Sequence, residues 1–301
     1  MINELQATFG FFAAAGLRYN LRSRVVFNQR RLTQLPIIKI FRYGKVYQPH
    51  LYPVQIFMQK NKLLLLFTIS FLLTGLYFTY PKNSSSTDNN RFLVYTVNPQ
   101  NNSLRFYWKD DSNKCFKSID RLKYSLEKQN KKLLFAMNGG MYKQDNSPLG
   151  LYIENGKTLA LLNTASATGN FYLKPNGVLF INNKKEAGIC TTPKFTNNGD
   201  IAYATQSGPM LVIDGQIHTA FKAGSQNVNI RNGVGILKNN RLVFVMTTTA
   251  VNFYDFALYF KNLGCTNALY LDGFVSRTYL PEKNWFQTDG NFGVIIGVTK
   301  P

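Results

Sequence analysis

Four short segments of this chain of 301 residues combine glycine with polar side chains that could take part in catalysis or ligand binding. The segments supply amide, hydroxyl, guanidinium and carboxylate groups, and they are Asn138–Tyr142, Gln206–Met210, Ser225–Gly233 and Asp272–Ser276. Glycine lets a ligand approach the backbone closely, and the exposed N–H groups can then hold an anion. The guanidinium of Arg231 is a planar fork that suits phosphate or carboxylate. These residue types predict a site for an anionic ligand.

Asp272 is the acidic residue best placed to act in such a site. Among the acids at predicted strand ends, only Asp272 is next to glycine and away from an evident two-residue hairpin. A Ser-His-Asp triad, a His- or Cys-based metal site and a nucleotide-binding loop are not indicated. The chain has two histidines, His50 and His218, three widely spaced cysteines and no Walker loop. We expect no cofactor. A divalent cation could bind between Asp272, Asn138 and backbone carbonyls, although no ligand spacing requires one.

Short strands must position these segments. Apolar runs typical of strands lie at 92–97, 104–108, 133–137, 150–153, 178–181, 202–205, 210–213, 233–237, 242–246, 268–271 and 292–298. Residue pairs typical of hairpin turns lie at 155–156, 176–177, 182–183, 214–215 and 239–240. The pattern predicts an α+β domain with a mixed, largely antiparallel β-sheet.

Two predicted helices interrupt the strands. Ser118 can cap one, with apolar residues at 119, 122 and 126, and Asn252 can cap the other, with apolar residues at 253, 256, 257 and 260. Each helix joins two strands, so each is a candidate crossover between parallel strands. The strands that follow the helices end at Asn138 and Asp272. Because ligands gather at the carboxyl ends of such strands, we expect these two residues to share a site.

One transmembrane helix is predicted before this domain. Residues 63–80 form an uncharged run of 18 residues, long enough as a helix to span about 27 Å of a bilayer. Lys60 and Lys62 precede the run, which places the N-terminus in the cytoplasm and the domain outside, in the periplasm or at the cell surface. No suitable cleavage site follows the run, which favours an uncleaved signal anchor in the inner membrane over a removed signal peptide.

The predicted organisation has four parts. Residues 1–57 are a basic leader that is either cytoplasmic or untranslated, with translation starting at Met58. Residues 58–82 are the signal anchor, 83–90 are a polar tether, and 91–301 are one domain. The net charge is +20, but residues 1–62 hold ten basic residues and one acidic residue, so nearly half of the excess precedes the domain. Because the remaining basic residues are scattered, we do not expect a nucleic-acid partner.

Five motifs, in order, resemble those of the phosphodiester glycosidase domain family. They are Asn138-Gly-Gly-Met-Tyr142, Ser147-Pro-Leu-Gly-Leu-Tyr-Ile-Glu-Asn-Gly156, Gln206-Ser-Gly-Pro-Met-Leu-Val-Ile-Asp-Gly215, Ile230-Arg-Asn-Gly-Val-Gly235 and Leu271-Asp-Gly-Phe-Val-Ser276. This family includes the uncovering enzyme, which removes N-acetylglucosamine from a sugar phosphodiester, and bacterial proteins linked with exopolysaccharide or cell-envelope metabolism. Many members carry Asp-Gly-Gly-x-Ser at the last motif, whereas Phe274 replaces the second glycine here.

The resemblance implies a hydrolase that cleaves the bond between a sugar anomeric carbon and a phosphate. A phosphate monoester is a stable leaving anion, so stabilising its charge matters more than protonating it. Arg231 is the residue we expect in that role. Asp272 would activate a water or attack the anomeric carbon directly. The substrate would be held by amide and hydroxyl side chains and by backbone N–H groups, at Asn138, Gly139, Gly140, Gln206, Ser207, Gly208, Asn232, Gly273 and Ser276.

A second interpretation is a non-catalytic module that binds anionic envelope glycans. The same glycine-containing segments and Arg231 could bind such a polymer without cleaving it. Tyr142, Tyr152 and Tyr172 could then stack on sugar rings. Release of product from a sugar phosphodiester distinguishes the enzyme from the binding module.

Overall fold

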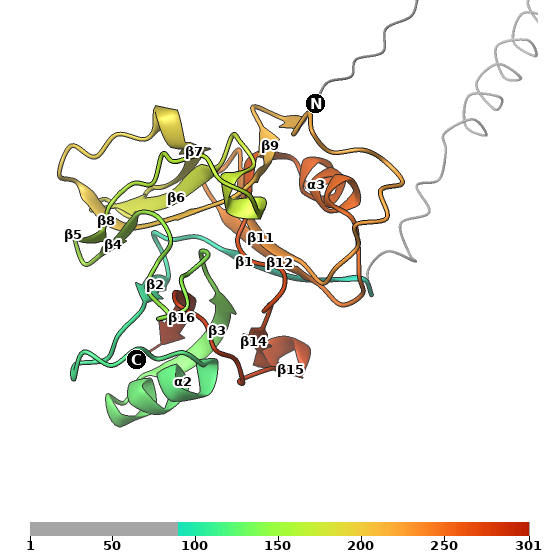
Figure 1. Cartoon of the computed structure of the whole chain (residues 1–301). Helices are drawn as coiled ribbons and strands as arrows, with labels where there is room; N and C mark the ends of the chain where they lie inside the picture. The colour runs from blue at the N-terminus through green and yellow to red at the C-terminus, as the bar shows by residue number, and fades with distance from the viewer. Residues whose placement is uncertain (1–89, 301) are drawn as a thin grey trace, which may run out of the picture. The chain divides into compact units, whose positions relative to one another are not determined.

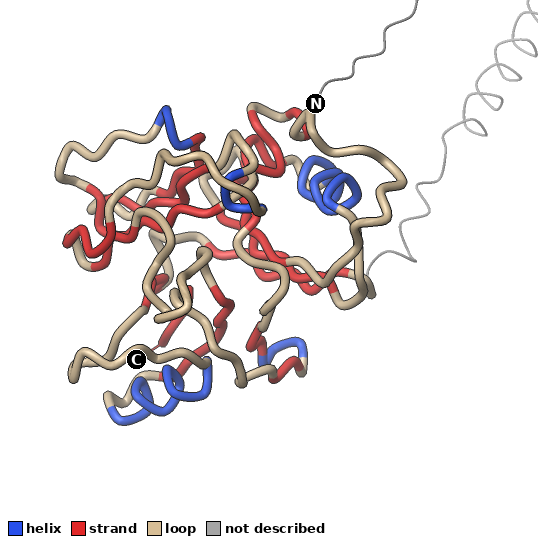
Figure 2. The backbone as a smooth tube through the Cα atoms, in the orientation of Figure 1, coloured by secondary structure: helices blue, strands red, loops and turns tan. Residues whose placement is uncertain are grey.

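The computed structural model describes residues 90–300, which form antiparallel sheets and two α-helices (Figures 1 and 2). The predicted leader, the predicted signal anchor and all of the tether except Asn90 lie outside the described residues. No helix within residues 90–300 has the length and apolar character needed to cross a membrane.

The first sheet has six strands and is covered on one face by helix α3 (Phe253–Asn262). The strands, in spatial order, are β1 (Phe92–Val97), β12 (Leu242–Thr247), β11 (Asn232–Leu237), β13 (Cys265–Tyr270), β9 (Met210–Ile213) and β10 (Gln216–Ile217). Asn252 caps the helix by accepting a hydrogen bond from the Asp255 N–H. The four apolar helix positions that the sequence predicts are buried against the sheet.

The second sheet has five strands and packs against helix α2 (Ile119–Lys128). Its order is β15 (Trp285–Phe286), β14 (Thr278–Leu280), β3 (Lys132–Asn138), β16 (Ile295–Lys300) and β2 (Ser103–Tyr107). Ser118 caps α2 by accepting a hydrogen bond from the Arg121 N–H. Ile119, Leu122 and Leu126 are buried, as their spacing predicts.

The third sheet also has five strands. Its order is β5 (Lys157–Ala160), β4 (Tyr152–Glu154), β8 (Ile201–Ser207), β6 (Gly177–Asn182) and β7 (Ala187–Thr191). Short 3-10 helices lie at Asn170–Tyr172, Thr192–Lys194 and Pro281–Lys283. All three sheets bury side chains in one central cluster, which includes Phe244 from the first sheet, Phe135 from the second and Leu179 from the third. This shared core fixes how the strand ends meet.

The α+β class and the two crossover helices are confirmed, but the prediction of a mixed sheet needs correction. Every strand pair among residues 90–300 is antiparallel. Helix α2 joins β2 to β3, which are parallel to each other but separated by β16. Helix α3 likewise joins β12 to β13 across β11. Each crossover therefore leaves room for an intervening antiparallel strand, which is the C-terminal strand β16 in the second sheet and the preceding strand β11 in the first.

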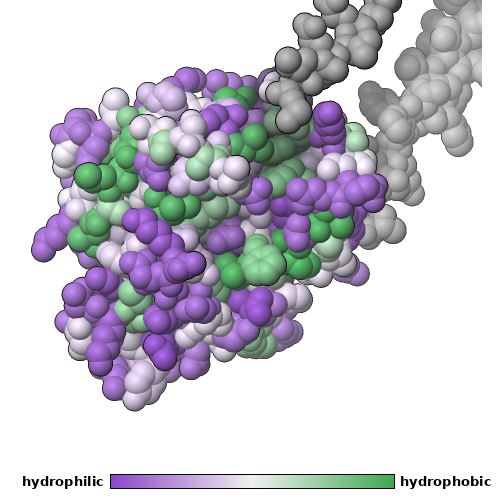
Figure 3. Space-filling view, in the orientation of Figure 1, coloured by the Kyte–Doolittle hydropathy of each residue, from purple (hydrophilic) through white to green (hydrophobic). Residues whose placement is uncertain are grey.

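The surface of the domain is not uniform. In the view of Figure 3, hydrophilic residues predominate around α2, whereas apolar residues gather in patches nearer the middle of the molecule. Exposed apolar side chains on the described part of the chain include Phe274, Ile230 and Val228. These three residues belong to the loops that carry the predicted site motifs.

Candidate active site

The candidate site lies where four strand ends meet. Asn138 ends β3, Ser207 ends β8, Asn232 begins β11, and Asp272 lies two residues beyond β13. Hydrogen bonds join Asn138, Asn232 and Asp272 to one another and Ser207 to Leu271, although up to 134 positions separate the partners in the chain. The structure therefore brings four of the predicted segments together through these residues.

Two buried asparagines form the centre of this site. The Nδ2 group of Asn232 donates to Asn138 Oδ1 at 2.9 Å and to the Asn138 carbonyl at 3.1 Å. Asn232 Oδ1 accepts from the backbone N–H of Asp272 at 2.8 Å, and Asn138 Nδ2 donates to the Asp272 carbonyl at 3.1 Å. Because both amides are buried, these bonds are shielded from water and are costly to lose.

The turn that carries Asp272 is also held from its other sides. The Ser207 hydroxyl donates to the Leu271 carbonyl at 2.5 Å, and the Ser276 hydroxyl donates to the Asp272 carbonyl at 3.0 Å. The backbone N–H of Arg277 donates to Asn138 Oδ1 at 2.9 Å. The backbone of Asp272 is therefore fixed by amide and hydroxyl groups from several strands.

The carboxyl group of Asp272, by contrast, has no side-chain partner. Asp272 is half-buried, and no side chain among residues 90–300 forms a hydrogen bond or an ion pair with its carboxyl group. Burial raises its pKa from 3.8 to about 6, and a hydrogen bond with the Phe274 backbone opposes the rise. Burial also raises the pKa of Tyr142, and the charge of Asp272 raises it further, so Tyr142 is close enough to sense that charge.

The site glycines are required by close packing. A Cβ atom on Gly140 would lie 2.7 Å from the Gln206 carbonyl, and one on Gly273 would collide with the Tyr270 hydroxyl and lie 2.7 Å from the Ile230 carbonyl. Gly139 and Gly208 are similarly enclosed by neighbouring atoms. Gly139 also donates its N–H to the Val294 carbonyl at 2.7 Å. Its N–H group is thus committed to the fold and not free for an anion.

The structure turns the Gln206 side chain away from Asp272. Its Oε1 atom accepts from the N–H groups of Leu151 and Asn163, at 3.0 and 2.9 Å. Its Nε2 group donates to the Asn163 carbonyl at 2.7 Å and to Thr192 Oγ1 at 3.1 Å. Because both the oxygen and the nitrogen of the amide form hydrogen bonds within the fold, Gln206 stabilises the segment around 151–163.

Arg231 is also placed differently from the expectation of a phosphate ligand. Its side chain is 1% exposed and stacks on Phe253, with the guanidinium carbon 3.6 Å from the ring centroid. Its Nε and Nη2 groups donate to the carbonyls of Val251 and Asn227, both at 2.8 Å. The Arg231 Nη1 group lies 3.5 Å from the Tyr270 hydroxyl, which itself lies against Gly273. Arg231 is thus linked to the Asp272 turn through Tyr270.

Asn138 is poorly placed to act as a ligand of a divalent cation. Its Oδ1 atom already accepts hydrogen bonds from Asn232 and Arg277, so both lone pairs are engaged. No group of three or more His, Cys, Asp or Glu side chains among residues 90–300 is arranged to hold a metal ion. The described His218 is buried, with Nε2 3.0 Å from the Lys174 carbonyl, and burial lowers its pKa.

Two residues of the site region, Tyr270 and Arg277, were not predicted from the motifs, and Phe274 was noted in the last motif without a role. Tyr270 reads as an ordinary strand residue, and Arg277 lies one residue beyond the last motif, which is the only signal that could have found it. Phe274 is 92% exposed on the turn that carries Asp272. Of the tyrosines proposed to stack on sugars, Tyr142 is near Asp272, whereas Tyr152 is fully buried and donates to Glu154.

Fold and site together define a class of protein: an α+β domain of antiparallel sheets that presents one unpaired carboxyl group on a rigid turn between strand ends. The chain belongs to the phosphodiester glycosidase family, because the model of that family matches residues 131–298, more than half of the chain. The match confirms the resemblance seen in the five motifs. All of the residues predicted for the site lie within the matched segment.

The chain is also similar to individual proteins of known sequence or structure. The uncharacterized protein YigE of Escherichia coli strain K12 is 41% identical over 188 residues, which cover 62% of this chain and 73% of YigE. Solved structures that are similar include the catalytic domain of zebrafish N-acetylglucosamine-1-phosphodiester alpha-N-acetylglucosaminidase, at 14% identity and a TM-score of 0.46 over 70% of this chain and 89% of that one. A putative exported protein from Burkholderia pseudomallei K96243 matches at 12% identity and a TM-score of 0.44, over 69% and 73% of the two chains.

Proposed function

We propose that this protein is a hydrolase that cleaves a sugar phosphodiester on its glycosidic side. The observation that carries the proposal is the Asp272 carboxyl group, which has a raised pKa and no side-chain partner on a turn held by buried amides. A carboxyl group placed in this way at a junction of strand ends is typical of a functional group, because nothing in the fold uses its charge. Family membership supplies the class of substrate.

The reaction breaks the bond between the anomeric carbon and the phosphate oxygen. The electron pair of that bond stays with the oxygen, which leaves as part of a phosphate monoester, and a water oxygen becomes bonded to the anomeric carbon. The Asp272 carboxylate either takes a proton from the attacking water or attacks the carbon itself and is then released by water. The first route inverts the anomeric configuration and the second retains it. Neither requires a second carboxylate to protonate the leaving group.

Other residues hold the reacting groups in place. Asn138, Asn232 and Ser276 fix the backbone on either side of the Asp272 carboxyl group. Arg277 is a cation attached to the same network, because its N–H group binds Asn138 and its guanidinium donates to the Ser276 carbonyl. Its side chain is 35% exposed, so it is accessible to a leaving phosphate in a way that Arg231 is not. We assign Arg277 to the leaving charge and Arg231 to support of the turn.

The proposal extends to location. The uncharged run at 63–80, preceded by Lys60 and Lys62, favours a membrane-anchored protein whose domain lies outside the cytoplasm. There it would act on phosphorylated carbohydrate of the cell envelope or of exopolysaccharide. The net positive charge of the domain suits work near anionic polymers.

Hydrolysis of the methyl phosphodiester of N-acetylglucosamine 1-phosphate in ¹⁸O-water tests the reaction. We expect release of N-acetylglucosamine that carries the label and of unlabelled methyl phosphate. Asp272→Asn should abolish this release, whereas Asp200→Asn, which changes an exposed acid, should not. Label in the phosphate would show cleavage of the P–O bond and would overturn the assignment.

The same experiment tests the binding-module alternative. Saturable binding of the phosphodiester without any product, under conditions that preserve the fold, would favour a non-catalytic module. Full activity of Asp272→Asn would remove Asp272 from the mechanism whatever the product.

A further inference from the structure

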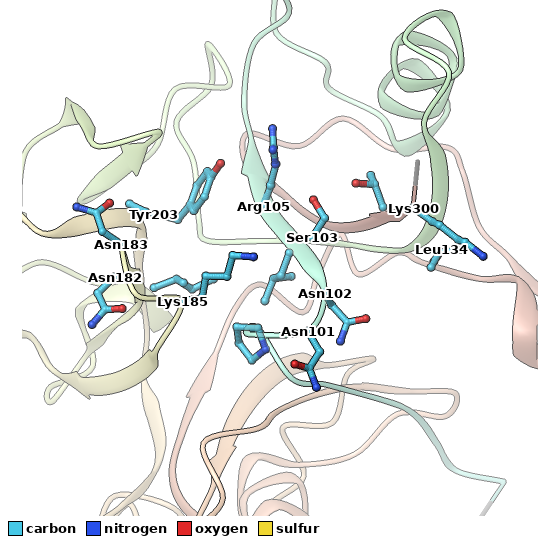
Figure 4. A pocket seen from close by; sticks show the side chains of 15 residues that line it. Asn101, Asn102, Ser103, Arg105, Leu134, Asn182, Asn183, Lys185, Tyr203 and Lys300 are labelled. Carbon is cyan, nitrogen blue, oxygen red and sulfur yellow. The ribbon is translucent and has the colours of Figure 1, made fainter.

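A second hollow lies away from the Asp272 site. Its volume is about 630 Å³, within the range of sites for small molecules, and it lies between strand β2 and the strands β6 and β8 of the third sheet (Figure 4). None of the residues predicted for catalysis or substrate binding lines it. It is therefore not an extension of the candidate active site.

The strands themselves separate the two places. Strand β3 contributes Leu134 to the cavity and ends at Asn138, and strand β8 contributes Tyr203 and ends at Ser207. Four residues of extended strand correspond to about 13 Å. The cavity and the Asp272 site thus lie at opposite ends of the same two strands, and a ligand in one leaves the other open.

The lining of the cavity is basic. Arg105 comes from β2, Lys185 from the β6–β7 turn and Lys300 from the end of β16, and no acidic residue lines the cavity. Figure 4 shows the Lys185 side chain extending from its turn toward β2. None of these three cations forms an ion pair within residues 90–300. Lys185 and Lys300 lie on opposite sides of β2, and the pairing of β2 with β16 puts Lys300 on the face opposite Arg105. Lys185 and Arg105 are therefore the cations available to one anionic ligand.

The same cavity offers uncommitted polar groups. The side chains of Asn101, Ser103 and Asn183 line it, and in the described part of the chain they form no hydrogen bond. The Tyr203 hydroxyl donates to Asn155 at 2.6 Å, which holds its ring in place on the cavity wall. Free amides and a hydroxyl beside a fixed aromatic ring suit the hydroxyl groups and the faces of a sugar.

We propose that this cavity is a second, non-catalytic binding site for a sugar that carries a phosphate or carboxylate group. Lys185 and Arg105 bind the anion, and uncommitted polar side chains of the cavity wall bind sugar hydroxyls. The ligand is a unit of an anionic glycan, held apart from the reaction at Asp272. The inference does not depend on hydrolysis, because no residue of the Asp272 site contributes to it.

Titration of the full chain with glucose 6-phosphate and glucuronic acid tests the proposal, with glucose as the neutral comparison. We expect saturable binding of at least one of the two anionic sugars that weakens as salt rises, and much weaker binding of glucose. Lys185→Ala or Arg105→Gln should each weaken it about tenfold, since each removes a charged hydrogen-bond donor. Preference between the two sugars shows whether phosphate or carboxylate is recognised.

Control variants distinguish binding in the cavity from nonspecific binding to basic residues elsewhere on the surface. Lys184→Ala removes the neighbouring lysine, which does not line the cavity, and Arg121→Gln removes an exposed arginine of α2. Both should bind like the unaltered protein. Equal weakening by these controls, equal binding of glucose, or no binding of either anionic sugar would overturn the proposal. Asp272→Asn should keep this binding, so failure of the cavity and failure of the hydrolase assignment give different results.

Discussion

At Asp272 the fold holds a backbone firmly and leaves a carboxyl group without a cation. Burial raises the pKa of this group from 3.8 to about 6. By linkage, the folded protein loses stability as pH rises from about 4 through about 6, by at most about 3 kcal/mol. A buried carboxylate that lowers the stability of the folded protein in this way is best explained by a role in catalysis.

Replacement of Asp272 by Asn should therefore stabilise the protein while removing its activity. Urea unfolding at about pH 8 should show a gain of up to about 3 kcal/mol, because the isosteric amide carries no charge to bury. Below about pH 4 the gain should vanish, since the carboxyl group is then protonated in both states. A variant that is less stable at high pH would show that the carboxylate is paired in the folded protein.

The same pKa sets the expected pH dependence of catalysis. The charged carboxylate is the active form whether Asp272 acts as base or nucleophile, so kcat/KM should rise with pH through about 6. The measurement is a pH–rate profile on the sugar phosphodiester. Arg277→Gln should lower activity without moving this limb, because the charge of Arg277 does not contribute to the pKa shift of Asp272. A profile that is flat between pH 5 and about 7 would contradict the role of Asp272.

Phe274 should determine how the substrate is bound. It is 92% exposed two residues after Asp272, and an aromatic ring there can stack on a sugar. Phe274→Gly should raise KM about fivefold with little change in kcat, and Phe274→Trp should preserve KM. Phe286→Ala, at another exposed phenylalanine, is the matched control. An unchanged KM in Phe274→Gly would remove the ring from the binding site.

At the scale of the elements, the site depends on strand ends that only tertiary structure brings together. Asn232 begins β11 and binds both the end of β3 and the residue beyond β13. Asn232→Ala would leave the buried Asn138 carbonyl and the Asp272 N–H without partners, which should destabilise the protein by about 2–4 kcal/mol. Denaturant unfolding measures this loss, and Asn197→Ala, at an exposed site, should cost little. Equal stability of the two variants would show that the asparagine network is dispensable.

Local pattern was enough to predict most elements. Helix caps at Ser118 and Asn252 and the apolar stripes behind them are short-range signals, and both helices form as expected. Strand β7 was not predicted, because its short sequence shows no clear apolar alternation. The pair Asn176-Gly177 was predicted to form a hairpin turn but does not; it follows a cis Lys174-Pro175 bond. The paired order of the strands is long-range information that no single segment carries.

The sequence likewise predicted some of the site residues correctly but not the directions of all their side chains. Glycine flanks and strand ends drew attention to Asn138, Asn232 and Asp272, which the structure joins. The same motifs also contain Gln206 and Arg231, whose side chains point to other partners. Sequence spacing shows that a polar residue is at a strand end, but the direction of its side chain depends on neighbours such as Phe253, which only the folded chain supplies.

At the scale of the whole molecule, the net charge of +20 divides into parts with different roles. Ten basic residues and one acidic residue lie in residues 1–62, and in the proposed membrane topology they would keep the N-terminus in the cytoplasm. Within the domain, the proposed second site gives a local role to Lys185 and Arg105, which line a cavity that has no acidic residue in its lining. A glycan bound there would stay near the domain while the Asp272 site remains free.

Membrane anchoring is the prediction that belongs to the full chain. After expression with a C-terminal tag, the protein should stay in the membrane fraction through an alkaline wash, and the tagged domain should be digested by protease added outside the inner membrane. Lys60→Glu with Lys62→Glu should reduce this exposure, because the positive flank is removed. A chain that starts at Met58 keeps both lysines and the uncharged run, so it should behave like the full chain. Release of the full chain by the alkaline wash would contradict the anchor, and protection of the domain from protease in intact spheroplasts would contradict the orientation.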